Sequence, residues 1–516
     1  MRSLGRLERM ALGVMVACTL FVAWFHARWH EPWRDEVQPV LIGRALDADA
    51  WHVLRLEGVP PVYFVLVSVL GRFVSPPYDL AIAGAIGYAV LLTGTYRFLR
   101  VLSDNPRGSL LVTMALGTTG PFVYELGVIA RQYGLGLGLC FWGAALLARN
   151  LKDGARRDAW WGATLLALAA LTSAHAACFA GGALFSYAVF VLLAQRRVRA
   201  LLPLTPAAAA LALTTLVVRA YPLRSPETNP KDKPVGEVVS AAHELFINCL
   251  TNPGWWSPGV RRRLEATLAA LFVAGMALAI AQALVRPKTP RPLVGFSLLA
   301  GLTASLPLLY IFVFRYRGGH RHHWFYVMPP VLITLGLSLV RDPTAVRWRR
   351  WLRALPLGLA LPLLGYQLWV SQKDLRADYA GALSSTKNVA ERLPQGASVA
   401  ADIDYTSIGL TYFRPDIAFY SASGGERRLR HLLADEGWHQ PGDLTRLSRA
   451  VCRTAPEGGV FATATTALPA GLASCASSFA REGEAMLETE RFSVWRVDCA
   501  CLAQDRTAHG GRSSDR

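Results

Sequence analysis

Charged residues are scarce in this chain of 516 residues, in which Asp, Glu, Lys and Arg together make up only 17%. Hydrophobic residues make up 53%. Apolar runs of about 20 residues, the length that crosses a bilayer as a helix, recur through residues 1–370 and then stop. A soluble chain of this size has more charge and shorter apolar runs. The scarcity of charge therefore excludes an ordinary soluble protein and predicts a polytopic membrane domain.

Acidic residues are also rare in one set of loops between the apolar runs, where arginine and lysine collect. The hydropathy criterion predicts eleven spans, near residues 10–27, 79–97, 108–125, 129–148, 159–175, 176–194, 200–219, 264–285, 293–314, 324–340 and 354–370. The basic loops join them at alternate ends and include Arg6 and Arg9, Arg97 and Arg100, Arg149 and Lys152, Arg196 and Arg197, Arg286 and Lys288, and Arg347 and Arg349. The positive-inside rule places these loops and the N-terminus in the cytoplasm.

The remaining loops, near 28–78 and 220–263, and everything after the last span then lie on the extracytoplasmic face. The net charge of +18 is explained by this orientation, so no nucleic-acid partner is predicted. No small-residue cleavage site follows the first apolar run, which is interpreted as a retained helix and not as a signal peptide. The sequence also contains no internal repeat.

Long apolar runs are missing after residue 370, so the chain divides into a transmembrane domain over 1–370 and an outer domain over 371–503. The outer domain alternates helix and strand signals and is predicted to be a small α/β domain. Its expected strands lie near 398–403, 417–420, 459–462 and 492–497, and helices are expected near 379–393, 406–413, 429–436 and 444–452. The polar end, 504–516, is predicted to be disordered.

The eight cysteines include no close CxxC pair with neighbouring histidines. Cys18, Cys140 and Cys178 fall in apolar spans and are interpreted as small core residues. Four more lie in the outer domain: Cys452, Cys475, Cys499 and Cys501. An oxidising compartment allows disulfides there, with three possible pairings, and a zinc site is the alternative. The cluster His320, Arg321, His322 and His323 could bind phosphate or a metal, but adjacent histidines do not share one face of a helix. No metal ligands are therefore assigned, and a divalent cation is left open as a cofactor.

Two adjacent carboxylates, Asp35 and Glu36, stand directly after the first span. Charge beside hydrocarbon is costly, so ionisable residues at such a place are usually functional. Neighbouring residues do not share one face of a helix, so one carboxylate is expected to face a cleft while the other supports it. The alternative is that Asp35 only caps a short surface helix over residues 35–46.

Three segments carry a resemblance to a known family. Residues 31–64 read EPWRDEVQPVLIGRAL and then WHVLRLEGVPPVYF, Tyr124-Glu125 is followed by Ala130-Arg131-Gln132-Tyr133, and residues 321–330 read RHHWFYVMPP. In order and sidedness they resemble the GT-C membrane glycosyltransferases. They are most similar to the group of glycosyltransferase family 39, the protein O-mannosyltransferases and the aminoarabinose transferases. The resemblance covers most of the chain through its architecture.

The resemblance implies an enzyme of the bacterial cytoplasmic membrane that takes a sugar from a polyprenyl-phosphate-linked donor at the outer face. Asp35 matches the family position of the base that deprotonates the acceptor hydroxyl, with Glu36 beside it. The residues expected to bind substrate are Arg131, Tyr133, Arg321, Glu57, Glu125 and His175. Arginine suits the lipid phosphate because it binds phosphate bidentately. For the two glutamates a local ion pair is the alternative, and for His175 an ordinary interface histidine.

Two other functions stay open on the sequence. A transporter or flippase of a lipid-linked glycan would carry ionisable residues in the middle of several spans, and such residues are nearly absent here. A catalytically inactive relative with a scaffold role is kept open by Val59, which stands where many relatives have histidine. Neither the sugar nor the acceptor, whether glycan, lipid or protein, follows from the sequence.

Overall fold

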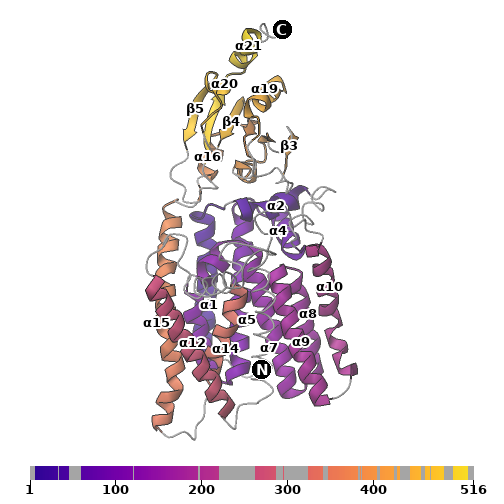
Figure 1. Cartoon of the computed structure of the whole chain (residues 1–516), viewed down its shortest axis with the longest axis vertical. Coiled ribbons are helices and arrows are strands. Elements are labelled where there is room, and N and C mark those ends of the chain that lie inside the picture. Colours follow the sequence, from indigo (N-terminus) through magenta and orange to yellow (C-terminus); the bar gives the residue numbers. More distant parts are fainter. Residues whose placement is uncertain are drawn as a thin grey trace, which may run out of the picture. The chain divides into compact units, whose positions relative to one another are not determined.

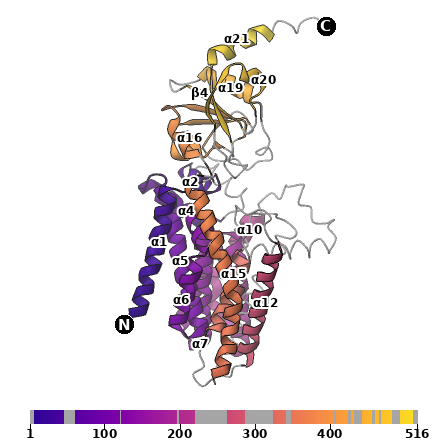
Figure 2. The same ribbon diagram turned by 90° about the vertical axis from the view of Figure 1, so that its left-hand side faces the viewer.

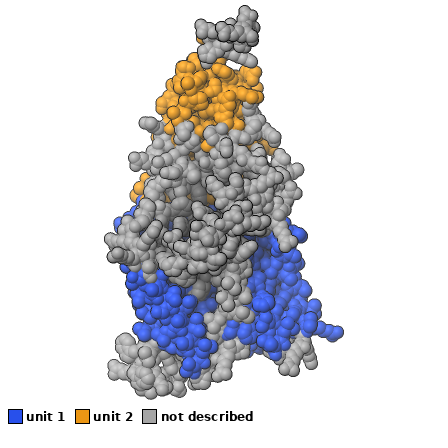
Figure 3. Space-filling model, in the orientation of Figure 1, with its two compact units in different colours: residues 1–25, 58–63, 81–376 blue, residues 26–57, 64–80, 377–516 orange. Residues whose placement is uncertain are grey.

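The computed structural model (Figures 1 and 2) describes residues 6–32, 34–45, 60–119, 121–195, 198–219, 262–285, 295, 324–340, 347–381, 384, 386–403, 407–422, 427–430, 442–454, 459–464, 467–481 and 492–509. The chain forms two compact units, coloured in Figure 3. Unit 1 comprises residues 1–25, 58–63 and 81–376, and unit 2 comprises 26–57, 64–80 and 377–516. From residue 377 on, the predicted outer domain falls in one unit with residues 26–57 and 64–80, whereas residues 371–376 belong to unit 1.

Seven of the described helical segments are long and apolar enough to cross a bilayer. They are Arg9–Arg28 in α1 (Arg6–Arg28), Tyr78–Ser103 (α5), Gln132–Asp153 (α7), Ala174–Leu193 in α9 (Ala174–Gln195), Val198–Val217 across η2 (Val198–Leu204) and α10 (Thr205–Arg219), Thr267–Val285 in α12 (Arg262–Val285) and Ala354–Tyr379 in α15 (Arg347–Tyr379). Each overlaps a predicted span, and the helices of unit 1 run alongside one another in both views (Figures 1 and 2). The prediction of a polytopic helical membrane domain is confirmed.

Three other predicted spans contain shorter helices. The segment 159–175 contains α8 (Arg156–Ala170), 324–340 contains α14 (Trp324–Ser338), and 108–125 divides into α6 (Pro106–Gly117) and the π-helix η1 (Pro121–Val128). The break after α6 has a local cause, because the hydroxyls of Thr118 and Thr119 donate to the carbonyls of Ala115 and Leu116. The segment 293–314 lies almost wholly outside the described residues, so the total of eleven spans stays a prediction.

Helices α5 and α7 approach so closely that only glycine fits between them. A Cβ on Gly94 would lie 2.5 Å from the carbonyl oxygen of Gly138, and a Cβ on Gly138 would lie 2.5 Å from the amide nitrogen of Leu91. A Cβ on Gly134 would clash with the carbonyl oxygen of Leu126 in η1. Small residues at an interface between membrane helices permit this backbone approach. The contact fixes the N-terminal end of α7, which follows Arg131.

Unit 2 contains a six-stranded sheet with the order β3-β2-β1-β4-β6-β5. The strands are β1 (Ser398–Ala401), β2 (Ala418–Ser421), β3 (Arg427–Leu429), β4 (Val460–Ala464), β5 (Ala476–Arg481) and β6 (Ser493–Val497). β1 pairs in parallel with β2 and β4, and the outer pairs are antiparallel. Helix α19 (Leu444–Thr454) buries Leu444, Leu447 and Val451 against the sheet. The predicted α/β character of this region is confirmed.

The two strands that the sequence did not predict, β3 and β5, are the edges of the sheet. Each pairs on one side only, and β5 is rich in small and polar residues that have little strand preference. β3 ends at Leu429, where a helix was expected to begin; most of that expected helix lies outside the described residues. The remaining described helices of this region are α16 (Thr386–Arg392), α18 (Leu410–Phe413), α20 (Ala470–Ala473) and α21 (Cys499–His509).

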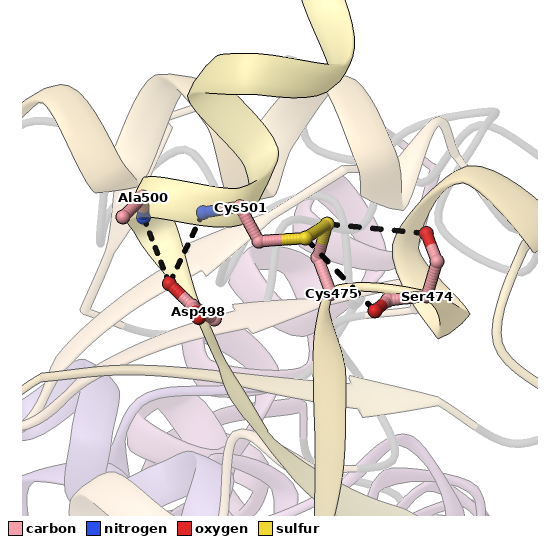
Figure 4. Close-up of a disulfide and its surroundings, with 5 residues drawn as sticks. All are labelled: Ser474, Cys475, Asp498, Ala500 and Cys501. Atoms are coloured by element: carbon pink, nitrogen blue, oxygen red, sulfur yellow. Dashed lines mark hydrogen bonds between the residues drawn. A yellow bond between two sulfur atoms is a disulfide. The ribbon is translucent and has the colours of Figure 1, made fainter.

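The structure selects one of the three disulfide pairings, Cys452 with Cys499 and Cys475 with Cys501. Both bonds hold the first turn of α21, which begins after Asp498. Figure 4 shows the bond between Cys475 and Cys501. Oδ1 of Asp498 accepts hydrogen bonds from the backbone amides of Ala500 (2.9 Å) and Cys501 (3.1 Å), as an N-cap does. α21 continues to His509, beyond Gln504 where the disordered tail was predicted to begin.

Candidate functional site

The carboxylates Asp35 and Glu36 lie in the first turn of α2 (Arg34–Ala45). The predicted surface helix is therefore present, but Asp35 is inside it and not at its N-cap position, since an N-cap precedes the first helical residue. Two acids in a first turn are favourable beside the positive end of the helix dipole. Asp35 is half-buried, whereas Glu36 is completely buried, so the two side chains differ in environment as expected.

Glu36 belongs to a buried triad with His30 and Asp378. Nε2 of His30 lies 2.9 and 3.1 Å from the two carboxylate oxygens of Glu36, and Nδ1 lies 2.6 Å from Oδ2 of Asp378. Burial lowers the pKa of His30, but the charges and hydrogen bonds of Asp378 and Glu36 outweigh it and raise the pKa to about 10. Without another cation His30 is therefore an imidazolium at neutral pH, and Glu36 is engaged in an ion pair.

Further polar contacts join the two ends of α2 to residues that follow position 377. Just before α2, Glu31 accepts hydrogen bonds of 3.3 Å from the amide of Lys387 and the side chain of Asn388. At its C-terminal end, the Arg44 guanidinium lies 5.3 Å from the ring centre of Tyr412. The Tyr412 hydroxyl donates a hydrogen bond of 2.5 Å to Asp79, in the first turn of α5. The helix that carries Asp35 is thus fixed on both sides within unit 2.

Unit 1 holds a second cluster, formed by Arg131, Tyr133 and His175. Arg131 has an extended backbone immediately before α7, and its guanidinium carbon lies 5.0 Å from the ring centre of Tyr133. The His175 ring packs edge-on against Tyr133, with centroids 6.1 Å apart and an interplanar angle of 79°. Tyr133 is buried, while Arg131 is half-buried. The structure thus brings together three side chains that the sequence analysis had named separately.

Tyr63 supports this cluster and was not among the predicted site residues. Its hydroxyl donates a hydrogen bond of 2.5 Å to the carbonyl of Ala130, which directly precedes Arg131. The neighbouring amide of Val62 donates to the carbonyl of Leu171 at 3.0 Å. The signal was present in the sequence, because Tyr63 is the aromatic residue after the double proline in the segment that carries the family resemblance.

Three other predicted site residues are Glu125, Glu57 and Arg321. Glu125 is buried in η1, six residues before Arg131. Glu57 and Arg321 lie outside the described residues, and their roles stay predictions. His30 and Asp378, in contrast, are site residues that the sequence analysis missed. His30 adjoined the recognised motif, whereas Asp378 lies 348 residues away along the chain and no local pattern links the two.

One group of side chains in the described part of the chain has the composition of a metal site. His26, His30 and Glu36 are buried and offer ligand atoms that all lie within 4.8 Å of one another. The rings of His26 and His30 lie 4.7 Å apart between centroids. Two imidazoles and one carboxylate form a common donor set for zinc.

Comparison with known proteins shows the fold but no close relative. The chain matches no model of a known protein family, and no curated relative matches it in sequence. Among solved structures, ArnT from Cupriavidus metallidurans bound to undecaprenyl phosphate has a TM-score of 0.58 at 14% identity, over 94% of this chain and 97% of that chain. The same ArnT in the apo state has a TM-score of 0.57 at 14% identity, over 95% and 98%.

A third similar structure is the archaeal oligosaccharyltransferase AglB from Archaeoglobus fulgidus, in complex with an inhibitory peptide and a dolichol-phosphate. It has a TM-score of 0.46 at 13% identity and covers 88% of this chain and 69% of that chain. Of these three structures, the two of ArnT have TM-scores above 0.5 and match nearly the whole chain, so the fold is assigned from them. The predicted architecture, a polytopic helical domain followed by a small sheet-containing domain, is confirmed, and the fold is ArnT-like.

Proposed function

We propose that this chain is a membrane glycosyltransferase that moves a sugar from a polyprenyl-phosphate-linked donor to an acceptor hydroxyl at the outer face of the membrane. The observation that carries the proposal is the half-buried Asp35 in the first turn of α2, a helix fixed on both sides, within a chain of ArnT-like fold. That ArnT was solved with undecaprenyl phosphate bound, which supports a lipid-phosphate donor for this chain. The mixed charge of the loops that carry Asp35, opposite the basic loops, supports the outer face as its location.

In the proposed reaction Asp35 acts as the general base. Its carboxylate accepts the proton of the acceptor hydroxyl as that oxygen attacks the anomeric carbon of the donor sugar. The bond between the anomeric carbon and the phosphate oxygen breaks in the same displacement, and the polyprenyl phosphate leaves with the bonding electrons. Attack from the face opposite the leaving group inverts the anomeric centre. Glu36 does not exchange protons in this scheme, because it is buried in the ion pair with His30.

Arg131 is the proposed ligand of the phosphate. A guanidinium stabilises the negative charge that develops on the leaving phosphate and binds two of its oxygens in parallel. The aromatic ring of Tyr133 positions the guanidinium from one face, and His175 supports that ring. Arg321 is proposed as a second cation for the phosphate. Glu57 and Glu125 are proposed to orient the sugar hydroxyls.

A transporter of lipid-linked glycans is the alternative function, and the sequence supports it less well. Transport across the bilayer needs polar or ionisable groups along the middle of several spans. In the seven described spans the charged residues lie within about two turns of the helix ends. This distribution favours chemistry at a membrane face over passage through the bilayer.

Replacing Asp35 by Asn tests the proposal. In cells where deletion of the gene removes one surface glycan, the Asp35→Asn chain is expected to reach the membrane in normal amount. It should not restore the glycan, because loss of the base lowers the transfer rate about 10²- to 10⁴-fold. The lipid-linked sugar should accumulate. Asp416→Asn, which removes a partly exposed carboxylate bound to Arg414, is the matched control and should restore the glycan. Full restoration by Asp35→Asn would overturn the assignment of the base.

A further inference from the structure

We propose that His26, His30 and Glu36 bind a zinc ion that fixes the start of α2. The three side chains are buried and their ligand atoms lie within 4.8 Å of one another. Tetrahedral zinc with bonds of about 2.0–2.1 Å holds neighbouring ligand atoms about 3.3 Å apart. The described arrangement therefore needs shifts of at most about 1.5 Å to close around the ion.

The ligands come from one short stretch of chain. His26 lies in the last turn of α1, His30 follows two residues after the helix ends at Arg28, and the two rings lie 4.7 Å apart between centroids. Glu36 returns from the first turn of α2 to face His30. Because the two rings adjoin, both imidazoles can approach the same point. A metal at this point links the end of the first span directly to the helix that carries Asp35.

Asp378 completes the arrangement that histidine ligands of metals usually have. Its Oδ2 lies 2.6 Å from Nδ1 of His30, which leaves Nε2 to face Glu36. A metal-bound histidine almost always donates its other ring N–H to a carboxylate or carbonyl, and this partner fixes the tautomer and the ring orientation. Both oxygens of Glu36 lie at similar distances from Nε2, 2.9 and 3.1 Å, so Glu36 can bind the ion through both and provide the fourth ligand.

The charges of the group also favour a divalent cation. Glu36 and Asp378 place two buried carboxylates against His30, and two carboxylates can balance the charge of one divalent cation. Oδ1 of Asp378 is buried without a hydrogen-bond partner among the described residues. Zinc is preferred to calcium or magnesium because two of the three ligands are nitrogen atoms.

The test measures metal on the purified full-length chain, in detergent and with an affinity tag that contains no histidine. After exposure to zinc and removal of loosely bound metal, elemental analysis should find about one zinc per chain. His30→Ala and Glu36→Gln should each lose it. Asp378→Asn should retain the site with about 10- to 100-fold weaker affinity. Asp416→Asn is the matched control and should keep the wild-type content.

X-ray absorption on the wild-type chain provides a second readout that does not depend on whether the variants fold. It should show two imidazole ligands and a remaining shell of oxygen without sulfur. A wild-type chain that binds no zinc, a shell that contains sulfur, or full zinc content in His30→Ala would each overturn the proposal. Asp35→Asn should keep its zinc, so the loss of zinc and the loss of sugar transfer can be told apart.

Discussion

The regions around Arg131 and around Asp35 are held in place by different physical means. In unit 1 the segment that precedes α7 is fixed by backbone contacts that only glycine allows and by a hydrogen bond from Tyr63 to a carbonyl. In unit 2 the start of α2 is fixed by the buried ionisable side chains of His30, Glu36 and Asp378. The sheet-containing part of unit 2 is cross-linked by two disulfides. Among apolar helices a chain is held by close approach, because charge is expensive there. Outside the apolar helices, ion pairs and disulfide bonds hold the chain in place instead.

After Asp35→Asn, the largest effect is expected at Arg131. Arg131→Gln removes the proposed phosphate ligand and should lower the rate of sugar transfer about 10²- to 10³-fold, with little change in thermal stability. Arg131→Lys keeps the charge but loses the parallel pair of hydrogen bonds, and should lie between the wild type and Arg131→Gln. The measurement is transfer from a synthetic polyprenyl-phosphate sugar by membranes that contain equal amounts of each chain.

Arg100→Gln is the control for Arg131→Gln, because Arg100 lies in the last turn of α5 on the predicted cytoplasmic side. It should leave the transfer rate unchanged. Equal activity of Arg131→Gln and the wild type would remove Arg131 from the mechanism and leave its aromatic contacts with a structural role only.

The difference between the two regions also explains which features the sequence could predict. Membrane helices depend on the local run of apolar residues, so all seven described spans overlap a predicted one. The largest error is at the last span, which was predicted to end at residue 370 and continues to Tyr379. The central strands β1 and β4 are buried at every position and have a strong apolar signal. The edge strands β3 and β5 have none and were missed. Local patterns also made Asp35, Glu36 and Arg131 candidate site residues, since each stands in a recognisable motif beside a span, and their roles stay predictions.

What the sequence could not predict depends on contacts between distant residues. Asp378 lies at the end of α15 and meets His30 only in the folded chain. The Tyr412 hydroxyl reaches Asp79 across 333 residues. The choice between three disulfide pairings also needed the fold, because the strand order brings Cys475 and Cys501 together. The sequence thus indicated which residues carry charge near the membrane face, but not which partners hold them.

The second prediction concerns the cross-links of unit 2. Replacing Cys475 and Cys501 together by Ser should lower the stability of the outer domain by about 2–4 kcal/mol, since this disulfide closes a loop of 26 residues. Cys178→Ser in a membrane span, where the cysteine is free, should change stability little. The midpoint of thermal unfolding with and without a reductant measures both. If the reductant lowers the unfolding midpoint of the wild type and of Cys475→Ser/Cys501→Ser by the same amount, the Cys475–Cys501 bond contributes nothing to stability.

The third prediction concerns the close packing of unit 1. Gly138→Ala places a methyl group 2.5 Å from a backbone nitrogen of α5 and should destabilise the membrane domain by about 1–3 kcal/mol. Gly365→Ala adds the same methyl group to α15, where nothing lies within 4 Å. It should be neutral or stabilising by up to about 1 kcal/mol, as expected for alanine in a helix. Thermal unfolding in detergent compares the two. Equal effects would mean that the α5–α7 contact is not as close as described.

The smallest effect is expected at the cap of α21. Asp498→Ala removes the acceptor of two backbone hydrogen bonds and should cost about 0.5–2 kcal/mol. Because two disulfides hold the first turn of this helix, the loss should appear as faster amide exchange at residues 500 and 501 and not as global unfolding. Asp498→Asn keeps an acceptor without the charge and should preserve the protection. If Asn and Ala behave alike, the carboxylate acts through its charge on the helix dipole, and unit 2 relies on electrostatics even where a neutral hydrogen bond would suffice.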